Sequence, residues 1–100
     1  MEKRKPHYGL DAIRAIVAAA GFSTFTQTAR INSVMMGLTD AQTLAVVASL
    51  AAPMFFKSMT TLRDSRVWQD VYHAPCPNGK TAYVKLTLQA GAVVIQFKEK

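Results

Sequence analysis

The sequence predicts an α+β protein in which three N-terminal helices pack on one face of a C-terminal antiparallel β-meander, leaving the other face partly open. Apolar residues recur at helical spacing up to about residue 56 and alternate with a period of two from residue 66. The chain has 100 residues, half of them hydrophobic, which is enough for one modest core. We therefore expect a single domain spanning residues 1–100.

The first helix is predicted between residues 10 and 20. Its apolar positions follow one another at spacings of three and four, as expected for one face of a helix: Leu10, Ile13, Ile16, Val17 and Ala20. Gly21 comes directly afterwards, where a left-handed residue commonly ends a helix.

Two further helices are predicted from capping signals. Thr24 and Gln27 have the spacing of a capping box, and Ile31, Val34, Met35 and Leu38 form an apolar stripe after them. Thr39 and Gln42 repeat the signal before the apolar run at residues 43–56, TLAVVASLAAPMFF. That run is shorter than the roughly 20 residues that span a bilayer, and Pro53 breaks it. We interpret it as a buried helix.

Three strands are expected in RVWQDVYH, KTAYVKLTLQ and AVVIQFKEK, which the turn-rich APCPNG and Gly91 separate. Alternation divides the second strand into an apolar set (Ala82, Val84, Leu86, Leu88) and a polar set (Tyr83, Lys85, Thr87, Gln89). The apolar set is expected to face the helices.

Charge favours a polyanionic partner. Twelve Lys and Arg against six Asp and Glu give a net charge of +6, a bias typical of proteins that bind nucleic acid or an acidic protein. The chain lacks a Gly-rich phosphate loop, HExxH and GxSxG, so it does not contain the motifs of P-loop nucleotide hydrolases, zinc proteases or serine hydrolases. Two histidines and one cysteine without paired acids argue against a metal site, so no cofactor is expected.

The open face of the sheet is the candidate site. Alternation places Tyr83, Lys85, Gln96 and Lys98 there, and Gln69 and His73 join them if the register of the first strand agrees. Amines neutralise phosphate, amides bind base edges or phosphate oxygens, and a phenol ring stacks on an unpaired base. No carboxylate is expected in this set. We assign Lys85, Gln96, His73 and Arg63 to RNA binding.

Simpler interpretations of the same residues stay open. Alternating polar residues also form the solvated side of ordinary antiparallel sheets. Lys57 lies where the third helix is expected to end, and a cation there would stabilise the helix dipole. Cys76, between two prolines, is most simply a surface thiol.

Several segments together resemble the MqsR family, the toxins of the MqsR/MqsA toxin-antitoxin systems. They are MEKRKPH at the start, FFKSMTT and VWQDVY in the middle, the strand AYVKLTL and the terminal FKEK, and they extend over essentially the whole chain. The segments around residues 24–40 and 73–81 match the family only loosely.

The resemblance implies a RelE-like fold and an endoribonuclease that cleaves mRNA without the ribosome, at triplets that begin with GC, such as GCU. The family's functional residues correspond to Lys57 of KSMTT, Gln69 of WQDVY, Tyr83 at the start of the second strand and Lys98 of FKEK. We expect these four to be catalytic.

The resemblance also implies a partner similar to MqsA, a zinc- and DNA-binding antitoxin through which the pair contacts operator DNA and represses its own operon. We expect a cytoplasmic location and no membrane contact. Two other functions stay open from the residues alone: an RNA-binding module without catalysis, and a domain whose basic surface binds only an acidic protein.

Overall fold

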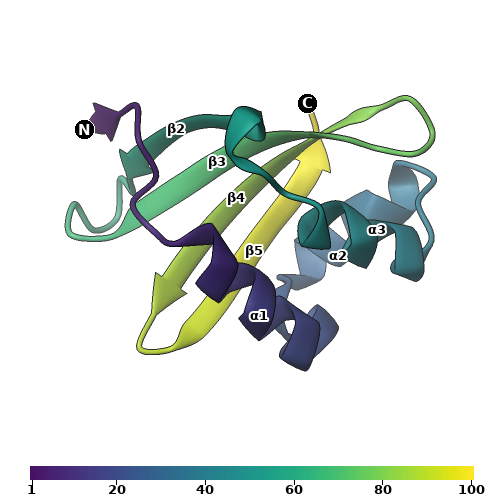
Figure 1. Cartoon of the computed structure of the whole chain (residues 1–100), viewed down its shortest axis with the longest axis horizontal. Coiled ribbons are helices and arrows are strands. Elements are labelled where there is room, and N and C mark those ends of the chain that lie inside the picture. Colours follow the sequence, from purple (N-terminus) through teal and green to yellow (C-terminus); the bar gives the residue numbers. More distant parts are fainter.

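A computed structural model describes residues 1–100 and contains three α-helices and a five-stranded antiparallel sheet, so the predicted α+β class is confirmed (Figure 1). The helices are α1 (Leu10–Ala20), α2 (Gln27–Met35) and α3 (Asp40–Ala48). The strands are β1 (Glu2–Lys3), β2 (Phe55–Thr60), β3 (Trp68–Pro75), β4 (Thr81–Gln89) and β5 (Ala92–Glu99), and they lie in the order β1-β2-β3-β4-β5. No helix has the length and apolar character needed to cross a membrane.

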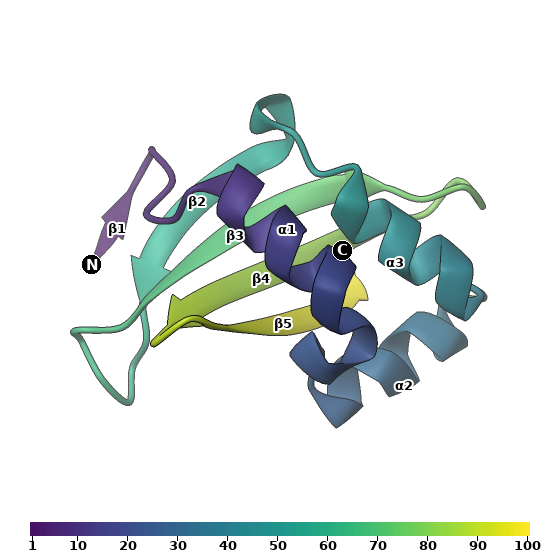
Figure 2. The same ribbon diagram turned by 60° about the horizontal axis from the view of Figure 1, so that its bottom comes forward.

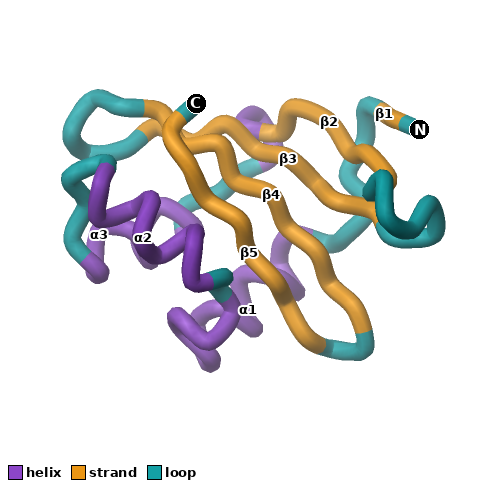
Figure 3. The backbone as a smooth tube through the Cα atoms, turned by 180° about the vertical axis from the view of Figure 1, so that it is seen from behind, coloured by secondary structure: helices purple, strands orange, loops and turns teal.

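Helices α1 and α3 lie on one side of the sheet, as predicted, whereas α2 lies beside the edge strand β5. Figure 2 shows α1 passing over the strands, with α3 beside it and α2 near its far end. Ala82, Val84 and Leu86 of β4 have no exposed surface, and they pack in one core with Ile13 and Val47 of the helices. Figure 3 gives the view from behind, with the strands in front of α1. We call this side of the sheet the uncovered face.

The first helix agrees with its prediction. Ile13 and Val17 are buried, and Gly21 ends the helix with a φ of 57°, a value that favours glycine. Its backbone N–H donates to the carbonyl of Val17.

The second helix begins later than predicted and buries different residues. Its N-cap is Thr26, whose hydroxyl accepts from the backbone N–H of Ala29, whereas Thr24 lies in a short 3-10 helix (Gly21–Thr24). The predicted apolar stripe is wrong, since Val34 and Met35 are more than half exposed. The buried residues of α2 are the small Ala29 and Ser33, because α2 lies close against β5.

The predicted buried helix at 43–56 is correct only in its first half. Thr39 and Gln42 form the predicted capping box, but α3 ends at Ala48. A short 3-10 helix containing Pro53 follows, and residues 55–60 form β2. Composition alone did not separate the two elements, because a short apolar run fits a buried strand as well as a helix.

The strand count was also underestimated. Besides β3, β4 and β5, which match the three expected strands, the sheet contains β2 and the two-residue β1. The buried Asp70 of β3 holds the N-terminal segment in place: its carboxylate accepts from the backbone N–H groups of His7 and Tyr8 at 2.9–3.0 Å and from Ser58 Oγ at 2.6 Å.

Candidate nucleic-acid interface

The register of the sheet aligns one side chain from each of four strands on the uncovered face: two lysines, one glutamine and the buried Val71. Lys57 lies opposite Val71, Val71 opposite Lys85, and Lys85 opposite Gln96. Directly opposed residues in an antiparallel sheet project to the same side. We call these four residues the lysine row.

A second row crosses the same face, shifted along the strands. His73 lies opposite Tyr83, and Tyr83 opposite Lys98. Phe56 stacks on His73 at 4.4 Å between ring centroids, and Lys98 Nζ lies 5.1 Å from the centroid of the Tyr83 ring. We call Phe56, His73, Tyr83 and Lys98 the aromatic row. The register of β3 therefore agrees with the prediction that His73 lies on the same face as Tyr83.

A bulge in β2 explains how two consecutive residues, Phe56 and Lys57, can lie on the same face of the sheet. Phe55 pairs with Tyr72 and Lys57 pairs with Val71, so Phe56 is an extra residue between them. Bulges of this kind change the direction in which side chains project. Here Phe55 packs against the core, while Phe56 and Lys57 both lie on the uncovered face. The expectation that Lys57 ends a helix is therefore wrong, because it is a strand residue.

The structure adds a carboxylate that the sequence analysis did not place on this face. Lys57 Nζ donates to Glu2 Oε2 at 2.8 Å, and this contact with its charge lowers the pKa of the Glu2 carboxyl group. Glu2 pairs with Met59 across β1 and β2. No sequence signal identified it, since a two-residue strand is too short for any periodicity.

Gln69 and Arg63 lie at one end of the uncovered face. Together with Lys85 and Gln96 they line an open depression of about 680 Å³ between the β2–β3 loop and the sheet. Gln69 is opposite Met59 in the β2–β3 pair. Of the predicted RNA-binding residues, Lys85 and Gln96 belong to the lysine row, His73 belongs to the aromatic row, and Arg63 lies beyond the rows in this depression.

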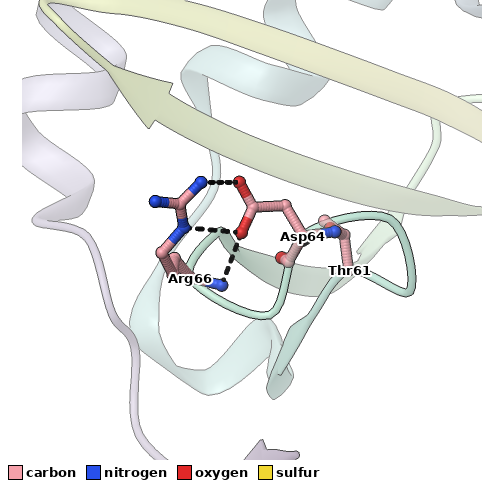
Figure 4. Close-up of polar contacts among 3 residues, drawn as sticks. All are labelled: Thr61, Asp64 and Arg66. Atoms are coloured by element: carbon pink, nitrogen blue, oxygen red, sulfur yellow. Dashed lines mark hydrogen bonds and ion pairs between the residues drawn. The ribbon is translucent and has the colours of Figure 1, made fainter.

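Internal contacts brace the loop that carries Arg63 (Figure 4). The Asp64 carboxylate accepts from Arg66 Nε at 3.0 Å and from a terminal nitrogen of the same guanidinium at 3.1 Å. The backbone N–H of Asp64 donates to Thr61 Oγ1 at 2.9 Å. Arg66 is therefore neutralised by Asp64, while Arg63 forms no ion pair.

Two basic groups on the face also have a lowered pKa. Burial lowers the pKa of the Lys85 ammonium group, and the positive charges of Lys98 and Lys57 lower it further. Burial, with a contribution from the charge of Lys100, lowers the pKa of His73, which favours the neutral imidazole. The lysine row is thus a site of concentrated positive potential.

The β5 side of the face is walled by α2. A depression of about 370 Å³ lies between this helix and the two last strands. Tyr83, Lys85 and Lys98 line it from the sheet, and Thr28 and Asn32 line it from α2. Neither α2 residue was predicted to belong to the site, because polar residues on a helix carry no signal of what they face.

Comparison with known proteins identifies the family. The sequence model described as "Motility quorum-sensing regulator, toxin of MqsA" matches residues 5–99. The chain is also 37% identical over 100 residues to the "mRNA interferase toxin MqsR" of Escherichia coli (strain K12), and the alignment covers all of both chains. The resemblance seen in the sequence is confirmed, and this chain belongs to the MqsR toxin family.

Proposed function

We propose that this protein is a toxin with mRNA interferase activity, an endoribonuclease whose site is the uncovered face of the sheet. The Escherichia coli relative carries this activity in its name. The observation that carries the proposal is the sheet register, which gathers Lys57, Lys85 and Lys98 from three strands around Tyr83. Such a surface attracts the phosphates of a single strand.

The chemistry uses the substrate's own 2'-hydroxyl group. This hydroxyl loses its proton and its oxygen attacks the adjacent phosphorus. The bond from phosphorus to the 5'-oxygen then breaks, and that oxygen takes up a proton. The products are a 2',3'-cyclic phosphate and a 5'-hydroxyl end, so neither a metal ion nor another cofactor enters the reaction.

Each of the four catalytic residues has a defined role. Tyr83 transfers a proton, with Lys98 beside its ring. Lys57 and Lys98 stabilise the negative charge of the phosphorane, an electrostatic contribution of about 3–4 kcal/mol for a well-placed donor. Gln69 orients the RNA strand. Lys85, Gln96, His73 and Arg63 bind the RNA on either side.

The finer features follow from family membership. We propose that cleavage is independent of the ribosome and occurs at triplets beginning with GC, such as GCU. The fold is RelE-like, and residues 1–100 act as one toxin domain.

The family description names MqsA as the antitoxin partner. We propose that the partner of this chain is a zinc- and DNA-binding protein of that kind. The toxin would then reach operator DNA only through the antitoxin, and the complex would repress its own operon. Complementary charge on the antitoxin would speed the association.

Cleavage of a 5'-labelled mRNA fragment by the purified protein in excess EDTA tests the proposal. Wild type should yield fragments ending in 2',3'-cyclic phosphate, while Tyr83→Phe and Lys57→Ala should each lose about 10²-fold or more in rate. Lys5→Ala, which removes an exposed lysine outside both rows, is the matched control.

Two results would contradict the assignment. Full activity in both Tyr83→Phe and Lys57→Ala would remove the catalytic roles. Intact RNA with wild type, together with binding that weakens by about 0.7 log units per phosphate contact for each log unit of salt, would mark an RNA-binding module without catalysis.

A further inference from the structure

The depression between α2 and strands β4 and β5 has the properties of a ligand pocket. Its volume of about 370 Å³ lies at the lower end of the range for small-molecule sites, about 300–1,000 Å³. The proposed catalytic residues Tyr83 and Lys98 form one wall, and Thr28 and Asn32 of α2 form the other. Any group bound here therefore lies next to the reacting phosphate.

The amide of Asn32 is held in one orientation. Its Nδ2 donates to the backbone carbonyl of Phe97 in β5 at 3.0 Å. A carbonyl oxygen only accepts hydrogen bonds, so the NH₂ side of the amide must face Phe97. The opposite atom, Oδ1, has no hydrogen-bond donor within the chain. Asn32 thus presents a fixed acceptor at the lining of the depression.

The sheet side of the depression offers a surface for stacking. Tyr83 contributes an aromatic ring, and Lys98 Nζ lies 5.1 Å from its centroid. Sequence-specific RNA recognition usually stacks an unpaired base on such a ring and reads the edge of the base by hydrogen bonds. A ring, a cation and an oriented acceptor are the parts that this mode of recognition requires.

We propose that this depression binds one nucleobase of the RNA next to the cleaved phosphate, and that Asn32 Oδ1 accepts a hydrogen bond from an exocyclic amino group of that base. Asn32 is then a specificity-determining residue. Cytosine presents an amino group where uracil presents a carbonyl oxygen, which repels an acceptor. The inference rests on the proposed function because it requires single-stranded RNA on the uncovered face.

Binding of two RNA hexamers of uniform sequence, oligocytidine and oligouridine, tests the inference. Both are 2'-O-methylated, which removes the nucleophile so that neither is cleaved, and fluorescence anisotropy measures their dissociation constants. Wild type should bind the cytidine hexamer about three- to tenfold more tightly, the effect of one net hydrogen bond. Asn32→Leu should bind both within about twofold.

Gln27→Leu is the matched control, because it makes the same amide-to-leucine change on a part of α2 that does not line the depression. It should keep the preference of wild type. Asn32→Ala removes the amide without added bulk, and it replaces Asn32→Leu if the larger side chain disturbs packing of α2 on β5. Melting curves establish that each variant is folded.

The outcomes separate the two proposals. Equal binding of both hexamers by wild type, or an unchanged preference in a folded Asn32 variant, would overturn the nucleobase pocket and leave the nuclease proposal intact. Wild type that binds neither hexamer would overturn the nucleobase pocket, and cleavage of the labelled mRNA fragment would decide the nuclease proposal separately. Wild type that binds with the expected preference but leaves unmodified RNA intact would overturn only the nuclease.

Discussion

Lys57 and Glu2 form an ion pair of 2.8 Å between Nζ and Oε2, although 55 residues separate them in the sequence. In the free protein, the Glu2 carboxylate thus accepts a hydrogen bond from the Lys57 ammonium group, which the proposed reaction requires for binding phosphate. The Lys57 side chain is only 20% exposed, so Glu2 and a phosphate would compete for the same ammonium group. The N-terminal strand therefore weakens the basic site that it adjoins.

Glu2→Gln should bind RNA more tightly than wild type. Removing the carboxylate frees Lys57 and takes away a negative charge that repels phosphate, and we expect an affinity gain of about two- to fivefold at low salt. A dissociation constant measured with a non-cleavable hexamer checks this. Glu99→Gln removes the same charge from a residue that pairs with Lys80 instead. Equal gains in the two variants would mean that net charge, and not the Lys57 contact, is responsible.

Lys85→Met should stabilise the fold at neutral pH and weaken RNA binding. The pKa of Lys85 is lowered by burial and by neighbouring lysines, so the folded protein disfavours the charged form. We expect a rise in Tm of about 2–4 °C at pH 7. The slope of log affinity against log salt should fall by about 0.7.

The pH dependence of that stability has a defined sign. Because the pKa of Lys85 is lower in the folded state, the unfolded chain binds more protons between the two pKa values, and wild type gains stability as pH rises through this window. The advantage of Lys85→Met in urea denaturation should therefore shrink as pH approaches about 10. Lys5→Met, at an exposed position, should show no such trend.

Asp70→Ala should destabilise the protein strongly. The buried carboxylate accepts from the backbone N–H groups of His7 and Tyr8 and from the Ser58 hydroxyl, and its removal leaves these donors unpaired. We expect a loss of about 2–4 kcal/mol in the free energy of unfolding, measured by urea denaturation. Asp64→Ala changes an aspartate whose contacts lie within its own loop, and its effect should be much smaller.

Cys76 should react slowly with thiol reagents in the folded protein. The prediction of a surface thiol is wrong, because the side chain is buried, and burial raises the pKa of the thiol group. Reaction with Ellman's reagent at pH 8 should be about tenfold or more slower than for a free thiol, and fast once urea is added. A fast reaction of the native protein would show that the β3–β4 connection opens readily.

The sequence by itself determined the side of each strand to which a residue projects. Alternation places Tyr83 and Lys85 on one face of β4 and the buried Val84 and Leu86 on the other, because neighbouring strand residues must point to opposite faces of a sheet. It also placed the capping box at Thr39, since that signal depends only on neighbours three residues apart. These are local properties of the backbone.

The tertiary structure alone decided the register of the strands and the addition of β1 and β2 to the sheet. Lys57 reaches the uncovered face because α3 stops at Ala48 and a bulge turns β2, and Glu2 joins it because β1 pairs with the edge of β2. Asn32 faces a depression because α2 packs against β5. Such contacts join residues far apart in the sequence, and their free energy comes from core burial and pairing across the whole chain, which local patterns do not contain.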